Sequence, residues 1–151
     1  MGMHLTRIEQ SYYSVQVAND HVILPVRDYE ASKRFYEGAL GSLGFELMLD
    51  WPDARRALFG ISGEPSSLWL VESQSAGTLE LCLGAEQPEA VDAFHAEALG
   101  AGGRSSWEPG IRPEFNRDYY AARIQDPDGN SIEVVCRGES AAAAVDRSVA
   151  A

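Results

Sequence analysis

The chain of 151 residues has few basic residues: 12 Lys and Arg stand against 23 Asp and Glu, a net charge of −11. A surface of this sign repels phosphate backbones and anionic headgroups, so we expect neither nucleic-acid binding nor membrane docking. Apolar runs are also short, as in Val22–Val26, whereas a transmembrane helix needs about 20 apolar residues. The N-terminus lacks the basic patch and apolar stretch of a secretory signal, so we expect a cytoplasmic location.

Cysteine is scarce as well. Cys82 and Cys136 lie far apart and outside any C-x-x-C motif, which favours reduced thiols over a disulfide framework. Strand phasing places both cysteines on the helix-covered side of their strands. The motifs of serine hydrolases, P-loop proteins and dinucleotide-binding proteins are absent from the sequence. Hydrophobic residues at 45% and charged residues at 23% are ordinary for a globular domain.

The most informative feature present is an internal repeat. Residues Phe35–Gly44 and Phe94–Gly103 share Phe, Ala, Leu and two Gly at equal positions, offset by 59 residues. Both segments have the apolar spacing of a helix with one buried face, and each follows a short apolar strand, near 21–26 and near 79–83. Each half then closes with strands, near 45–49, 56–61 and 67–71 in the first and near 104–107, 119–124 and 131–136 in the second.

Each half therefore reads strand, helix, strand, strand, strand. A unit of about 55–60 residues buries too little surface to be stable alone, so we expect the two to pair. The predicted fold is α+β, with two paired βαβββ modules forming a curved mixed sheet around a cup. The predicted domain spans residues 19–138, with modules at 19–75 and 77–138. Residues 1–18, with a weak strand pattern at 12–17, form an extension, and 139–151 form an alanine-rich tail.

At this stage the sequence resembles a known family. The segment from His21 through Phe35, Tyr36 and Gly41, together with the run Tyr119–Glu133 and its Asp-Pro-Asp-Gly-Asn turn, is similar to the vicinal oxygen chelate superfamily. That superfamily includes glyoxalase I, extradiol dioxygenases, fosfomycin-resistance transferases and bleomycin-binding proteins. The resemblance spans about residues 19–137 and implies the paired modules. The fold hosts several chemistries and therefore does not fix a reaction.

The resemblance also implies a metal site at the first and last strand of each module. The matching corners in this chain are His21, Trp69, Leu79 and Glu133, and relatives hold Fe, Mn, Zn or Ni with two His and one carboxylate. Leu79 has no donor atom and Trp69 replaces another donor, so His21 and Glu133 remain as a two-ligand metal pair.

Three functions stay open on this basis. One is a metal-dependent lyase, isomerase or dioxygenase of the glyoxalase type. Another is a metal-free protein that binds or sequesters a small organic molecule in the cup, and the third is a metal-free lyase or isomerase with Glu133 or His21 as general base. The candidate ligand-binding residues are Trp69, Leu79, Tyr119 and Arg112, and a homodimer is the expected assembly.

The final hairpin carries the sharpest prediction. Opposed residues of an antiparallel hairpin have a constant index sum, and a loop closed by Asp126 and Asn130 gives 256. Arg123 then faces Glu133, the pair we predict to carry the chemistry. A guanidinium there balances Glu133 in place of a metal and binds a ligand carboxylate or enolate, unless the pair serves only to hold the hairpin.

Overall fold

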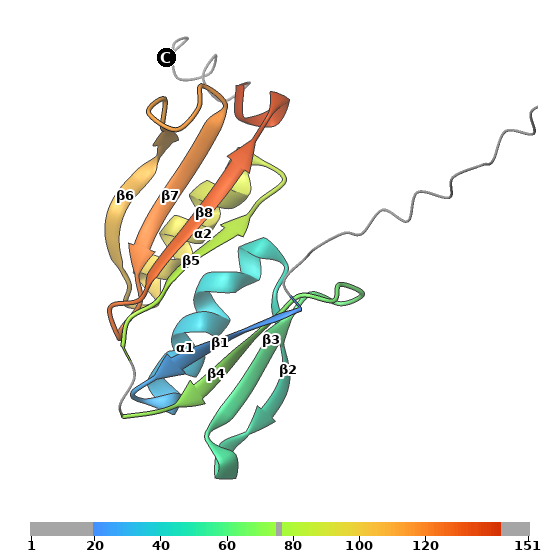
Figure 1. The fold of residues 1–151 in the computed structure, drawn as a ribbon, viewed down its shortest axis with the longest axis vertical. Coiled ribbons are helices and arrows are strands. Elements are labelled where there is room, and N and C mark those ends of the chain that lie inside the picture. Colours follow the sequence, from blue (N-terminus) through green and yellow to red (C-terminus); the bar gives the residue numbers. More distant parts are fainter. Residues whose placement is uncertain (1–19, 75–76, 143–151) are drawn as a thin grey trace, which may run out of the picture.

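The computed structural model describes residues 20–74 and 77–142, and the same order of elements occurs twice in it (Figure 1). The first module contains β1 (His21–Val26), α1 (Tyr29–Leu40), the 3-10 turn η1 (Gly41–Leu43), β2 (Glu46–Trp51), the 3-10 turn η2 (Pro52–Ala54), β3 (Arg56–Gly60) and β4 (Ser67–Glu72). The second contains β5 (Glu80–Gly84), α2 (Pro88–Gly100), β6 (Arg104–Ile111), β7 (Tyr119–Gln125) and β8 (Ser131–Arg137). The predicted strand at 12–17 lies outside the described residues, and of the predicted tail 139–142 are helical.

Each module forms a four-stranded mixed sheet. The strand orders are β1-β4-β3-β2 and β5-β8-β7-β6, with β1–β4 and β5–β8 parallel and the other neighbours antiparallel. Phe35 and Phe94 are each the seventh residue of their helix and both are buried. The predicted α+β fold with two βαβββ modules is therefore confirmed.

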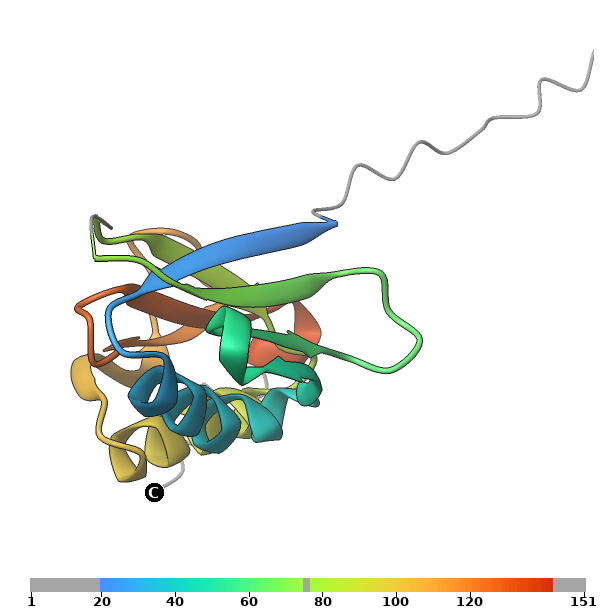
Figure 2. The same cartoon turned by 90° about the horizontal axis from the view of Figure 1, so that it is seen from below.

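One hydrophobic core joins the two modules. Both helices lie on one side of the molecule beneath the sheets, and they pack against each other (Figure 2). Their buried faces meet the alternate residues of the central strands, including Phe59 and Leu70 in the first module and Ile124 and Ile132 in the second. Among the described residues, the opposite face of each sheet carries no helix, and we call it the open face.

The two sheets remain separate. In the part of the chain that the structure describes, β1 and β5 are edge strands and neither pairs with the other sheet. A hollow of about 770 Å³ lies between the modules, lined by β1, β4 and η1 on one side and by β5 and the start of α2 on the other. None of the described helices is long and apolar enough to cross a membrane.

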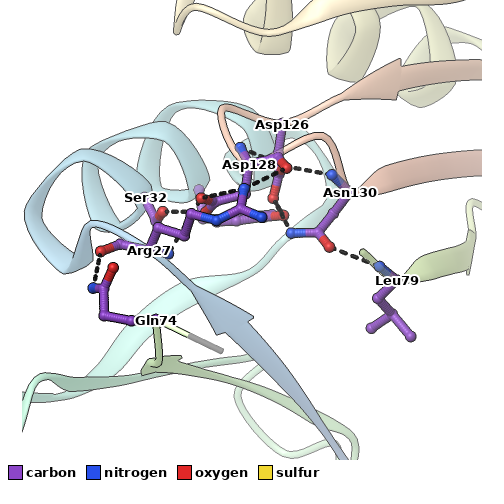
Figure 3. Close-up of polar contacts among 8 residues, drawn as sticks. Arg27, Ser32, Gln74, Leu79, Asp126, Asp128 and Asn130 are labelled. Carbon is purple, nitrogen blue, oxygen red and sulfur yellow. Dashed lines mark hydrogen bonds and ion pairs between the residues drawn. The ribbon is translucent and has the colours of Figure 1, made fainter. Parts of the chain in front are cut away.

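A polar clamp holds the modules together at the turn between β7 and β8 (Figure 3). Asp128 of this turn accepts a hydrogen bond from the backbone N–H of Arg27 at 3.2 Å and one from the Ser32 hydroxyl at 3.3 Å. The buried carboxylate of Asp126 accepts a hydrogen bond from Tyr36 of α1 at 2.6 Å. These hydrogen bonds attach the second module to the first turns of α1 and to the residue Arg27 before it.

The same turn orders β5. Asn130 donates to Asp126 through its backbone N–H and its side-chain amide, and its Oδ1 accepts the N–H of Leu79 at 2.8 Å. The Asp-Pro-Asp-Gly-Asn turn therefore reverses the chain and also bonds to two other segments. These are the start of β5 and the beginning of α1 in the first module.

Within the first module, Tyr29 anchors α1 to β2 and β4. Its ring is fully buried, its hydroxyl donates to Asp50, and its backbone N–H donates to Glu72 at 2.9 Å. Burial and the hydrogen bond to Asp50 raise the pKa of Tyr29 to about 12. Lys33 completes the group with an ion pair to Asp50 at 2.9 Å, which lowers the pKa of that carboxyl.

Candidate ligand-binding face of the second sheet

A buried carboxylate marks the open face of the second sheet. Glu133 on β8 is 7% exposed, and its Oε2 accepts a hydrogen bond from Arg123 Nη2 at 2.6 Å. Its Oε1 accepts a hydrogen bond from the hydroxyl of Tyr119. Both carboxylate oxygens are thus engaged, and the guanidinium balances the charge that burial would otherwise make costly.

The alternation of β8 explains why this carboxylate lies here. Ile132 and Val134 point into the core, so Glu133 and Val135 must lie on the opposite face. The observed register pairs Arg123 with Glu133, which confirms both the predicted index sum and the predicted ion pair.

Aromatic rings and arginines cover the rest of this face. The Arg123 guanidinium lies 3.7 Å and that of Arg112 5.0 Å from the centre of the Trp107 ring. Arg137 lies 4.5 Å from the ring of Tyr119 in the same way. Such stacking orders long arginine side chains, and it leaves their charge at the surface of a protein that is acidic overall.

The Tyr119 hydroxyl and the Cys82 thiol stay protonated at neutral pH, because the pKa of each is raised. Burial, and then the hydrogen bond to Glu133, raise the pKa of Tyr119. Burial, together with the charge of Glu133, raises the pKa of the Cys82 thiol, so Cys82 is a poor candidate for a nucleophile. Cys82 therefore does not supply an activated thiolate on this face.

The strand register corrects one predicted correspondence. In the first sheet His21 pairs with Ser67, and in the second Glu80 pairs with Ser131. The counterpart of His21 is therefore Glu80 and not Leu79, as the repeat offset of 59 also requires. Leu79 packs against the core. It does not contribute to the floor of a cup.

The same shift by one residue corrects the predicted placement of Cys82. It pairs with Glu133 and lies on the open face, exposed, whereas Cys136 is buried on the helix side as predicted. Because side chains alternate along a strand, an error of one residue in β5 moves every side chain to the wrong face.

The other predicted residues divide between the sheets. Arg123, Glu133, Tyr119 and Arg112 gather on the second sheet, the last through its contact with Trp107. Trp69 lies on the first sheet, where its ring centre is 5.4 Å from that of Trp51. His21 is exposed at the start of β1, with Nδ1 2.9 Å from Asp20.

The predicted metal pair of His21 and Glu133 does not fit a metal ion within one chain. The imidazole of His21 lies at hydrogen-bond distance from Asp20, and both oxygens of Glu133 already accept hydrogen bonds. Across residues 20–74 and 77–142, no three His, Cys, Asp or Glu side chains gather closely enough to hold a metal. The donor chemistry at Glu133 is that of a carboxylate in an ion pair.

Three residues of this face were missed from the sequence. Arg137 could have been predicted, because the index sum of 256 places it opposite Tyr119. Trp107 could not, because two register shifts in β6 prevent counting residues from β7 to β6. Phe115 lies in the loop between β6 and β7, where side chains follow no strand alternation. The centre of its ring lies 5.9 Å from that of Trp107 and 5.2 Å from that of Tyr119.

Comparison with known proteins agrees with this architecture. The sequence profile of the Glyoxalase/Bleomycin resistance protein/Dioxygenase superfamily matches residues 19–134. The chain belongs to this superfamily, which is the vicinal oxygen chelate superfamily that the motifs indicated. Curated proteins gave no match.

Solved structures include two informative relatives. A glyoxalase/bleomycin resistance protein from Albidiferax ferrireducens T118 is 30% identical, with a TM-score of 0.65 over 78% of this chain and 97% of its own. TnmS3, an antibiotic binding protein from Streptomyces sp. CB03234, is 28% identical, with a TM-score of 0.61 over 82% of this chain and 98% of its own.

Proposed function

We propose that this protein binds a small organic molecule on the open face of its second sheet and needs no metal to do so. The observation that carries the proposal is the state of Glu133, whose two oxygens are held by Arg123 and Tyr119. The Arg123 guanidinium supplies the positive charge that balances this carboxylate. The antibiotic-binding relative, at 28% identity, supports a binding role on this fold.

A homodimer in a cytoplasmic setting belongs to the same proposal. β1 and β5 present open edges, and Ile23, Leu49 and Trp51 are 56%, 39% and 47% exposed. A second copy that covers these side chains would remove apolar surface from water. The two cysteines are free, as expected in a reducing compartment.

A second candidate is a metal-dependent lyase, isomerase or dioxygenase, and one observation favours it. His21 and Glu80 occupy equivalent register positions, and Glu80 lines the same small hollow of about 120 Å³ as Glu133. His21 of a second copy would have to join these two carboxylates to complete three donors. In that case the ion of Fe, Mn, Zn or Ni would be shared between chains.

The test begins with chelator-treated protein whose metal content is measured by elemental analysis. Its thermal unfolding is recorded with a panel of small aromatic, dicarbonyl and aliphatic compounds, because a ligand that binds only the folded state raises the melting temperature. We expect some aromatic compounds to raise it, and Trp107→Ala to abolish the shift. The matched variant Trp51→Ala, on the first sheet, should keep it.

Two results would contradict the proposal. One is a panel without any shift. The other is a set of shifts that appears only after a divalent metal is restored and that is lost in His21→Ala, which would favour the metal-dependent candidate.

A further inference from the structure

We infer that the ligand of this face is a planar aromatic carboxylate, an inference that rests on the proposed binding function and specifies its ligand class. Side chains on the open face of the second sheet lie in rows across its strands. Strand register places Cys82, Glu133, Arg123 and Trp107 in one row on the open face. Arg137, Tyr119 and Arg112 form a second row, four residues further along β8.

Small side chains separate these two rows. Gly84, Val135, Ala121 and Gly110 lie in register between them. The Tyr119 ring lies over Val135 and Ala121 and reaches Glu133, so the space between the rows is already filled there. The accessible part is the place beside Trp107 and Tyr119 that the exposed ring of Phe115 occupies, which we call the slot, with these two rings and the neighbouring guanidinia as its walls.

Phe115 shows that the slot accepts a ring. It comes from the loop between β6 and β7, and its ring contacts Trp107 in the first row and Tyr119 in the second. Its side chain is 57% exposed, so it leaves the slot at low cost. A ligand ring that takes its place gains the same two aromatic neighbours.

The charge of the walls selects an anion. Arg123 is balanced by Glu133, but among the described residues neither Arg112 nor Arg137 makes an ion pair. The other carboxylates of these strands and of the loop between β6 and β7 are Glu80, Glu108, Glu114 beside Phe115, and Asp118, which accepts the N–H of Gly138. None of them is in an ion pair with Arg112 or Arg137 among the described residues, so these two guanidinia are the cations that a ligand anion can meet.

Two unsatisfied donors point to a carboxylate in particular. The Nε atoms of Arg112 and Arg123 are buried without a hydrogen-bond partner in the described part of the chain. Buried N–H groups are rarely left unpaired, and carboxylate oxygens are the strongest acceptors for guanidinium donors. Both guanidinia contact the ring of Trp107, so one ligand that stacks there reaches both.

The test uses 2-naphthoate as the probe and 2-naphthamide as its neutral isostere, with both affinities measured by titration calorimetry on the full chain. We expect naphthoate to bind at least about tenfold more tightly than the amide, a factor typical of a charge-assisted hydrogen bond. Arg112→Gln should remove most of this preference and leave amide binding unchanged. Arg34→Gln, an exposed arginine of α1, is the matched control and should change neither affinity.

Phe115→Ala provides a second readout, which a purely structural role for these residues would not give. Because it empties the slot, it should increase the naphthoate affinity several-fold. Equal affinities for naphthoate and the amide would overturn the inference while leaving the proposed binding function intact. A loss of naphthoate affinity in Phe115→Ala, or no change, would also overturn it, since the ring would then bind elsewhere. Binding of neither probe, together with a silent compound panel, would contradict the proposed function itself.

Discussion

Replacing Arg123 with leucine should destabilise the fold strongly, because the change leaves Glu133 as a buried carboxylate without its cation. The Glu133 side chain is 9% exposed and that of Arg123 26%. Removing one partner of a buried ion pair costs roughly 3–5 kcal/mol, and the partial exposure of Arg123 places this pair at the lower end, about 3 kcal/mol. For a domain of this size, that loss lowers the melting temperature by roughly 10 °C.

The assay is urea unfolding followed by far-UV circular dichroism, with the slope of the transition checked for a two-state change. Arg104→Leu is the matched control, since Arg104 is exposed and makes one side-chain bond to Gln125; it should cost less than about 0.5 kcal/mol. The double variant Arg123→Leu with Glu133→Gln should recover about half of the loss, since a neutral amide still accepts the bond from Tyr119. A loss below about 0.5 kcal/mol for Arg123→Leu, or no recovery in the double variant, would refute the reasoning.

Three further predictions concern stability. Since the pKa of Tyr29 is about 12, against an ordinary value of 10, the folded state holds this proton more tightly; its contribution is complete below pH 10 and is lost as the pH rises towards 12. Urea unfolding across this range should therefore show a steeper decline for the wild type than for Tyr29→Phe, and equal slopes would argue against the assignment. Gly103→Ala should cost roughly 1–3 kcal/mol because its Cβ would lie 2.9 Å from the Ala98 carbonyl oxygen, whereas Gly100→Ala, with open space around it, should be neutral or stabilising. Leu79→Ala should cost about 1–2 kcal/mol and Glu80→Ala less than about 0.5, and the reverse order in thermal unfolding would contradict the register of β5.

The parts of the structure that were predictable are those with strong local constraints. The β7–β8 hairpin has a tight turn fixed by Asp126 and Asn130, so counting from the turn gave the Arg123–Glu133 pair correctly. The repeated helix pattern around Phe35 and Phe94 likewise gave both modules, because it encodes a buried face that each module needs.

The parts that were missed lack such constraints. β5 is an edge strand with a parallel neighbour, so no hairpin turn fixes its register, although the alternation of Leu79, Leu81 and Leu83 indicates the core face. The register shifts in β6 made the face of Trp107 unpredictable, and Phe115 lies in a loop that has no periodic pattern. The proposed ligand slot depends on β6 and on this loop, which is why the sequence predicted Arg112 and Tyr119 but not the slot itself.

The most direct test of metal-independent binding is calorimetric titration of 2-naphthoate into the protein before and after metal removal by a chelator, with metal content measured in both samples. We expect the same affinity in the two samples, because Arg112, Arg123 and Trp107 would supply the contacts without a metal. Loss of binding on chelation, followed by recovery when one equivalent of a divalent metal is restored, would contradict it.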